Sequence, residues 1–269
     1  MVQDILPQLH KYQLQSLVIE LGVAKQGKLP ATLSRAIHAC VLNWLSLADS
    51  QLANQIHDSQ ISPLCLSGLI GNRRQPYSLL GDYFLLRIGV LQPSLIKPLL
   101  KGIEAQETQT LELGKFPFII RQVYSMPQSH KLSQLTDYYS LALYSPTMTE
   151  IQLKFLSPTS FKQIQGVQPF PLPELVFNSL LRKWNHFAPQ ELKFPEIQWQ
   201  SFVSAFELKT HALKMEGGAQ IGSQGWAKYC FKDTEQARIA SILSHFAFYA
   251  GVGRKTTMGM GQTQLLVNT

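Results

Sequence analysis

The order in which strand and helix signals follow one another constrains this chain of 269 residues more than any single motif does. In each half, apolar periodicity indicates a strand, a helix, two strands, another helix and a last strand. The first half is predicted as strand 13–23, helix 31–48, a short second helix that is capped by Asp49 or Ser50 and ends near His57, a hairpin at 77–91 that turns at Gly81-Asp82, helix 93–105 and strand material at 111–124. The second half is predicted as strand 150–156, helix 173–187, strands 199–213 and 222–231, a helix that is capped by Asp233 or Thr234 and ends near Ala250, and strand 259–267.

This β-α-β-β-α-β order is the order of the ferredoxin-like unit. We therefore predict an α+β chain with two tandem ferredoxin-like (RRM-like) domains, residues 1–145 and 146–269, each of ordinary domain size. Between them, the polar residues 125–134 show no apolar period and predict a loop. Residues 138–144 fit either a strand or part of a crossover.

A glycine-rich segment lies between the last predicted helix and the last predicted strand. Residues 251–261 read GVGRKTTMGMG, with four glycines and the cation pair Arg254 and Lys255. Glycine allows close backbone approach, and cations beside exposed N–H groups suit a phosphate backbone. The segment is not a Walker A loop, because Arg254 rather than glycine precedes Lys255, and it does not open a helix after a strand as a dinucleotide fingerprint does. The remaining alternative is a tight connection without a ligand.

Composition narrows the class of protein. Lys and Arg number 24 against 17 Asp and Glu, and the resulting net charge of +7 fits a nucleic-acid partner. Cys40, Cys65 and Cys230 are scattered and odd in number, which argues against a zinc site or a disulfide framework and predicts buried thiols in a reducing compartment. The sequence shows neither a secretory signal nor an uninterrupted apolar run of membrane-spanning length, so we expect a cytoplasmic protein.

Several motifs together resemble one family, the CRISPR repeat-processing endoribonucleases of the RAMP superfamily. The C-terminal match is the more specific and consists of residues 225–229 followed by 246–262. Residues 155–162, 171–173 and 179–184 resemble the first strand and helix of the family's second domain, whereas residues 35–38, 56–59 and 66–67 resemble its first helical region and histidine segment. The resemblance implies tandem ferredoxin-like domains and an enzyme that binds precursor CRISPR RNA and cuts within each repeat.

RNA can be cut without a metal ion, because the ribose 2′-OH can attack the neighbouring phosphorus and expel the 5′-oxygen. Such a reaction needs a base, an acid and cations that stabilise the charged transition state. Histidine suits the first two roles and arginine or lysine the third. The sequence contains no H-E-x-x-H motif and no carboxylate and cysteine cluster around its seven histidines, so we expect no metal or other cofactor.

His57 is the first candidate for acid or base, because it ends a short helix beside polar residues and falls where the resemblance places the family's histidine. His38 is the rival, three residues after Arg35 on one helix face. Arg35 is the first candidate for the stabilising cation, with Arg182 from the second domain as another. By resemblance, some relatives use a lysine shortly after the histidine; no lysine lies between His57 and Ser67 here, which favours arginine.

The predicted RNA-binding residues form a basic loop, a pair of scattered lysines and the glycine-rich segment. They are Arg73, Arg74, Lys183, Lys228, Gly251, Gly253, Arg254, Lys255, Thr256, Gly259 and Gly261. The segment is expected either to lie against the RNA or to brace the cleft between the domains. The products should be a 5′-hydroxyl and a 2′,3′-cyclic phosphate.

Two other functions stay open. The first is a non-catalytic RNA-binding subunit of the same superfamily in a CRISPR effector complex, and the second is a basic scaffold without RNA activity. The expected partners are precursor and processed repeat RNA, and an effector complex and a homodimer also remain open.

Overall fold

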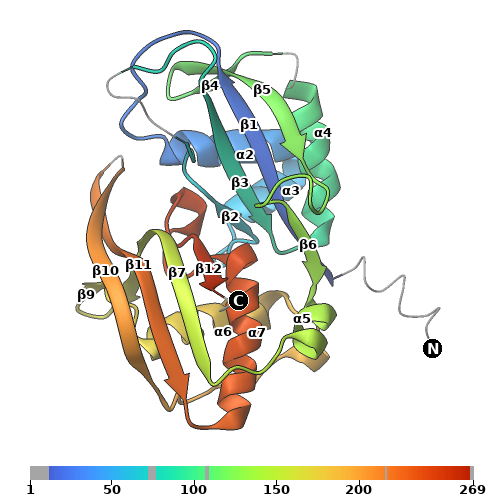
Figure 1. Ribbon diagram of the computed structural model, residues 1–269. Helices are drawn as coiled ribbons and strands as arrows, with labels where there is room; N and C mark the ends of the chain where they lie inside the picture. The colour runs from blue at the N-terminus through green and yellow to red at the C-terminus, as the bar shows by residue number, and fades with distance from the viewer. Residues whose placement is uncertain (1–11, 72–76, 107–108, 216, 267–269) are drawn as a thin grey trace, which may run out of the picture.

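The computed structural model describes residues 12–71, 77–106, 109–215 and 217–266. Two antiparallel sheets lie one above the other, and each is covered on one face by helices (Figure 1). Both sheets have the strand order of the ferredoxin-like fold, so the predicted α+β architecture with two tandem domains is confirmed. Among the described residues, no helix has the length and apolar character that crossing a membrane requires.

The N-terminal sheet has the order β2-β3-β1-β5-β4, and β6 pairs with β1. Its elements are β1 (Gln13–Val23), α2 (Ser34–Ala48), α3 (Ser50–His57), β2 (Leu64–Leu66), β3 (Tyr83–Val90), a 3-10 turn (Pro93–Leu95), α4 (Ile96–Gln106), β4 (Leu111–Leu113), β5 (Phe116–Tyr124) and β6 (Gln134–Asp137). Asp49 begins α3 as predicted, since its side chain accepts a hydrogen bond from the Leu52 amide. The alternate residues Leu17, Ile19 and Leu21 of β1 pack with Trp44 of α2 in one core.

The predicted hairpin at 77–91 is wrong in its first arm. The second arm is β3, but β1 occupies one of its edges, and β2 followed by Ile70, which bridges Leu85, occupies the other. No edge remains for residues 77–80, which form a turn in which the Leu79 amide donates to the Asp82 carboxylate. Ser78 makes one isolated bridge, with Gly27.

Residues 138–144 form no strand, which leaves the crossover alternative. They are the helix α5 (Tyr138–Tyr144), which begins after Asp137 because the Asp137 carboxylate accepts from the Ser140 amide at 2.9 Å. Tyr138 is fully buried in the core of the C-terminal domain. The predicted boundary near 145 therefore falls after a helix that packs with the second domain.

The C-terminal sheet has the order β10-β11-β7-β12. Its domain contains β7 (Glu150–Thr159), the hairpin β8 (Phe161–Gln163) and β9 (Gly166–Gln168), α6 (Pro173–Phe187), a 3-10 turn (Gln190–Leu192), β10 (Ser201–Met215), β11 (Gly218–Phe231), α7 (Thr234–Ala250), a 3-10 turn (Thr256–Met258) and β12 (Thr263–Leu266). Asp233 caps α7, and Gly251 ends it with a positive φ of 63°. The C-terminal end of α7 and the glycine-rich segment thereby reach the N-terminal domain.

Candidate active site

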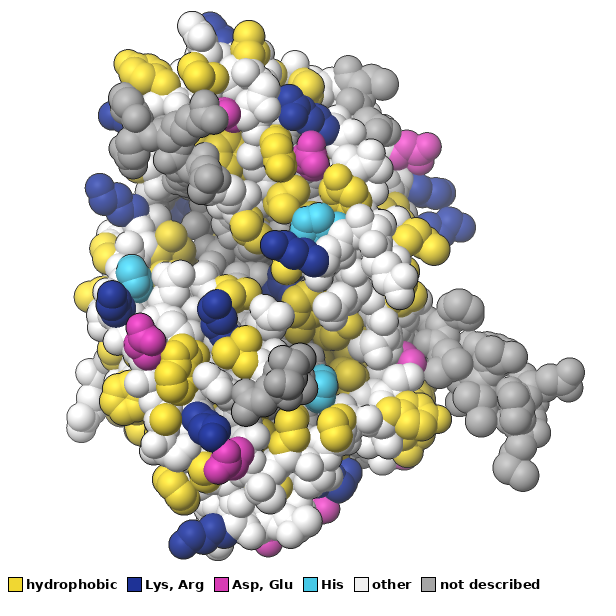
Figure 2. Space-filling model, viewed as in Figure 1, with side chains coloured by type: hydrophobic (Ala, Val, Ile, Leu, Met, Phe, Trp, Pro, Cys, Tyr) yellow, Lys and Arg dark blue, Asp and Glu magenta, His cyan; other side chains and the backbone are white. Residues whose placement is uncertain are grey.

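A cleft of about 690 Å³ lies where the two domains meet. Its lining comes from the start of α2, from 67–70 after β2, from the β10–β11 hairpin, from Phe248 of α7, from Gly259 and from residues just after the glycine-rich segment. Arg87, Lys131 and Lys214 are in this lining, and no carboxylate is among the described lining residues. Figure 2 shows the surface hollowed between the domains, with Lys and Arg side chains around the hollow. The charge of the cleft therefore suits a polyanion.

Most backbone amides of the glycine-rich segment are engaged within the C-terminal domain, and Gly259 also forms a bridge with Ser67 of the N-terminal domain. Seven of its amides already donate to acceptors within the protein, namely those of Gly251, Val252, Gly253, Arg254, Met258, Met260 and Gly261. A Cβ on Gly261 would stand 2.1 Å from the Val252 carbonyl oxygen, and one on Gly253 would stand 2.4 Å from the Ser160 oxygen. These glycines are required by the packing of the segment itself. The prediction that exposed N–H groups here cradle phosphate is wrong for these seven amides.

The charged side chains of the segment, Arg254 and Lys255, lie in its middle. Arg254 is half-buried, Lys255 is exposed, and Lys255 has a left-handed φ of 54° at the start of the turn Thr256–Met258. Thr256 is buried. The RNA contacts predicted at Arg254 and Lys255 would therefore be made by their side chains. The glycines and Thr256 hold the segment in place.

Lys183 cannot contact RNA directly. It is buried on α6, and its ammonium donates to the Ala250 oxygen at 2.5 Å and to the Thr256 hydroxyl at 2.9 Å, and is 3.5 Å from the Gly251 oxygen. Burial lowers the pKa of Lys183 to about 8. The Lys183 ammonium thus provides a hydrogen-bond donor at the C-terminal end of α7, where carbonyl groups lack helical partners.

Lys228 and Arg182 stand apart from the cleft lining. Lys228 forms an ion pair of 2.5 Å with Glu150, toward the end of β11 that lies away from the N-terminal domain (Figure 1). Arg182 is exposed on α6, next to the buried Lys183. Arg73 and Arg74 lie outside the described residues.

A cation cluster lies between the start of α2 and the crest of the glycine-rich segment. Arg254 and Arg35 lie near Lys255. Burial of Lys255, followed by the positive charges of Arg254 and Arg35, lowers the pKa of Lys255. The Arg35 guanidinium also lies 4.0 Å from the point where a Cβ on Gly217, in the β10–β11 hairpin, would stand. The two domains therefore each contribute cations to one place.

His38 lies one helical turn beyond Arg35 on α2 and is half-buried. Its pKa is lowered by burial and by the nearby His57. His57 is exposed at the end of α3. The structure thus brings the two candidate histidines close enough to interact and places His38 on the same helix as Arg35.

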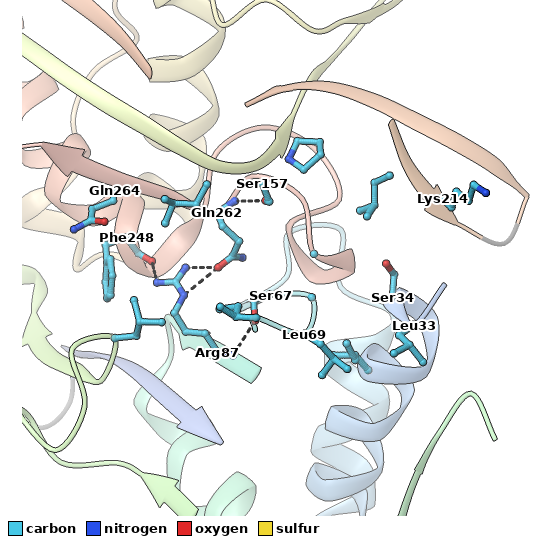
Figure 3. Close-up of a pocket in the computed structure, with 18 of the residues that line it drawn as sticks. Leu33, Ser34, Ser67, Leu69, Arg87, Ser157, Lys214, Phe248, Gln262 and Gln264 are labelled. Atoms are coloured by element: carbon cyan, nitrogen blue, oxygen red, sulfur yellow. Dashed lines mark hydrogen bonds between the residues drawn. The ribbon is translucent and has the colours of Figure 1, made fainter. Parts of the chain in front are cut away.

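Two residues that the sequence analysis missed connect the domains. Arg87, in the middle of β3, donates from Nε to the Gln262 Oε1 atom at 3.0 Å and from Nη1 to the Phe248 carbonyl oxygen at 2.6 Å (Figure 3). Gln262, directly after Gly261, donates from Nε2 to the Leu66 oxygen at 3.0 Å. A lone arginine within an apolar strand was the available signal for Arg87.

Of the three cysteines, Cys40 and Cys65 are buried and Cys230 is half-buried, all without disulfides. Among the described residues, no group of three or more His, Cys, Asp or Glu side chains is placed to hold a metal ion.

Comparison with known proteins shows which family this chain resembles. The sequence model of the family CRISPR-associated endoribonuclease Cas6 matches residues 153–263. A structure described as a Cas6 product complex superposes with a TM-score of 0.81 at 26% identity, covering 94% of this chain and 100% of that one. The resemblance to Cas6 endoribonucleases is confirmed.

Further comparisons agree. The Cas6 of Mycobacterium tuberculosis is 29% identical over 140 residues, which are 50% of this chain and 44% of that protein. The matched segment therefore spans about half the length of this relative. A second structure of the protein in that product complex, a Cas6 of Thermus thermophilus, gives a TM-score of 0.72 at 25% identity and covers 95% of this chain and 99% of its own.

Proposed function

We propose that this chain is an endoribonuclease that binds precursor CRISPR RNA across the cleft between its domains and cuts it within the repeat. The observation that carries this proposal is the cation cluster of Arg35, Arg254 and Lys255 beside His38, in a fold that matches Cas6 structures along nearly the whole chain. One of the similar Cas6 structures carries a histidine-to-alanine substitution, and another is a complex with a substrate mimic.

The reaction is metal-independent attack of the ribose 2′-oxygen on the adjacent phosphorus. The bond from phosphorus to the 5′-oxygen breaks, the 2′ proton goes to a base, and an acid protonates the departing 5′-oxygen. The products are a 2′,3′-cyclic phosphate and a 5′-hydroxyl. Negative charge grows on the phosphoryl oxygens, so cations held near them lower the barrier.

His38 is the base in this proposal. Burial and the neighbouring His57 lower its pKa, which keeps the imidazole neutral and able to accept a proton near neutral pH. His57, exposed and close by, is the acid. Arg35 and Lys255 stabilise the phosphoryl charge, and Arg182 stays a secondary candidate because it is exposed on α6.

RNA affinity comes from Lys131 and Lys214, which line the cleft, and from Arg254 and Lys255 of the cation cluster. Contacts of this kind follow the phosphate backbone and weaken as salt increases. The processed RNA is a further partner, and membership of an effector complex and homodimerisation remain predictions of the sequence.

The decisive experiment is single-turnover cleavage of the cognate repeat RNA in excess EDTA. Wild type is compared with His38→Ala, His57→Ala and His186→Ala, the last being an exposed histidine at the end of α6 that serves as the control. An RNA with a 2′-deoxy ribose at the cut site should resist. Loss of general acid or base catalysis should lower the rate about 10²–10⁴-fold while RNA binding persists.

Each outcome decides something. If His38→Ala or His57→Ala cuts at the wild-type rate, that histidine has no part in the reaction. Cutting of the deoxy RNA would exclude attack by the 2′-oxygen. If wild type binds the repeat and never cuts it, the non-catalytic RNA-binding subunit replaces the enzyme as the function.

A further inference from the structure

The proposed active site is divided between the domains. Arg35 and His38 stand on α2 of the N-terminal domain, whereas Lys255 stands on the glycine-rich segment of the C-terminal domain. Their relative placement therefore depends on how the segment is held against the first domain. Gly259 forms a backbone bridge with Ser67 of the N-terminal domain. This bridge does not by itself fix the position of the C-terminal end of the segment.

Gln262 fixes that end. Its Oε1 atom accepts from two nitrogens of Arg87, and its Nε2 atom donates to the Leu66 oxygen at 3.0 Å and lies 3.1 Å from the Cys65 sulfur. Its backbone amide donates to the Ser157 hydroxyl at 3.0 Å. Because this side chain must accept from Arg87 and donate to Leu66, both in the N-terminal domain, an amide is the group that satisfies the two partners at once.

Stability alone gives little reason for Arg87 to be there. Its side chain is buried, its exposed fraction is 3%, and no ion pair with a carboxylate is found for it among the described residues. Its contacts are the neutral Gln262 amide, the Phe248 carbonyl and the Phe248 ring, whose centroid is 4.5 Å from the guanidinium carbon. A buried charge without a counter-ion is expensive, and apolar groups of similar volume often stabilise a core as well.

Arg87 and Gln262 thus supply fixed geometry at a contact between the two domains, directly after the glycine-rich segment. We propose that these two residues are positioning residues that lock the domains together and hold Lys255 in register with Arg35 and His38. This inference rests on the proposed function. It assigns to Arg87 and Gln262 no contact with the reacting atoms.

The test uses the full chain with Gln262→Leu and with the double variant Arg87→Met/Gln262→Leu. Thr263→Val is the matched control, because Thr263 is the next residue, is buried and donates to the Gly261 oxygen at 2.9 Å within the C-terminal domain. The double variant removes the buried charge together with its partner, so that it can fold with an apolar contact. Each protein is measured for thermal unfolding, RNA affinity, single-turnover cleavage in EDTA and amide hydrogen exchange of residues 255–261 without RNA.

The lock predicts that Gln262→Leu and the double variant fold, bind RNA within about threefold of wild type and cleave about 10²-fold more slowly, since misplacement of a catalytic group by about 1 Å has such an effect. Residues 255–261 should exchange faster in these variants, and Thr263→Val should resemble wild type in every measurement.

Wild-type cleavage by a folded Gln262→Leu protein overturns the proposal. So does an equal loss in Thr263→Val, which would indicate a general packing effect, or a rate loss matched by an equal loss of RNA affinity. If wild type itself fails to cut, the proposed function is refuted; unchanged hydrogen exchange in Gln262→Leu refutes the lock separately.

Discussion

Lys183 gives the sharpest physical prediction, because it is a buried lysine with neutral partners. Its ammonium faces the Ala250 oxygen, at the C-terminal end of α7, and the Thr256 hydroxyl. Burial lowers its pKa from 10.5 to about 8 in the folded protein. The perturbation is Lys183→Met, which keeps a long apolar stem and removes the titrating group.

The sign follows from proton binding. Between about pH 8 and 10.5, the unfolded chain holds a proton on Lys183 that the folded protein has lost, so stability contributed by this group rises with pH. The full shift corresponds to about 3 kcal/mol. From about pH 7 to about pH 9.5, the free energy of unfolding of wild type should gain about 2 kcal/mol relative to Lys183→Met.

Urea unfolding of both proteins at several pH values across this window measures the difference. Tyr138, Tyr229 and Tyr249 also have raised pKa values because they are buried, but both proteins contain them, so the subtraction removes their contribution. A difference that stays flat with pH, or that falls, would refute the assignment of Lys183 as a buried and easily neutralised lysine.

Other changes test the cation cluster and the packing of the glycine-rich segment. Arg35→Ala and Lys255→Ala should each slow cleavage and reduce the steepness of the salt dependence of RNA binding by about 0.7–0.9, as fluorescence anisotropy at several salt concentrations would show; an unchanged slope would mean no phosphate contact. Gly261→Ala should destabilise the fold by about 3 kcal/mol or more, because its φ is 72° and the new Cβ would meet the Val252 oxygen. Gly68→Ala, which meets nothing within 4 Å, should leave the melting temperature nearly unchanged.

The elements that could be predicted from the sequence are those with local signals. Asp49 and Asp233 cap α3 and α7 as expected, since a cap needs only a side chain and an amide three residues away. The helix at 173–187 begins and ends at the predicted residues, because Pro173 fits a first helical turn. The order of elements, and hence the ferredoxin-like topology, followed from such signals.

Pairing and burial depend on distant parts of the chain and could not be predicted. Residues 77–80 resemble a hairpin arm, yet β1 occupies one edge of β3, and β2 followed by Ile70 occupies the other. Lys183 and Arg182 are neighbours in a basic stretch, and nothing local indicates that one is buried against α7 and the other exposed. The role of Gln262 likewise depends on Arg87, which is 175 residues away.

The glycine-rich segment shows how one motif can support two different mechanisms. A phosphate-binding nest requires free amides that point toward the ligand. Here seven amides are already engaged, while Arg254 and Lys255 turn their side chains outward at a left-handed residue. The glycines therefore hold the segment in place, and we expect the ligand to be bound by the cations. RNA binding should then respond to the charge of Arg254 and Lys255, whereas cleavage should also respond to Gln262, which determines where that charge lies.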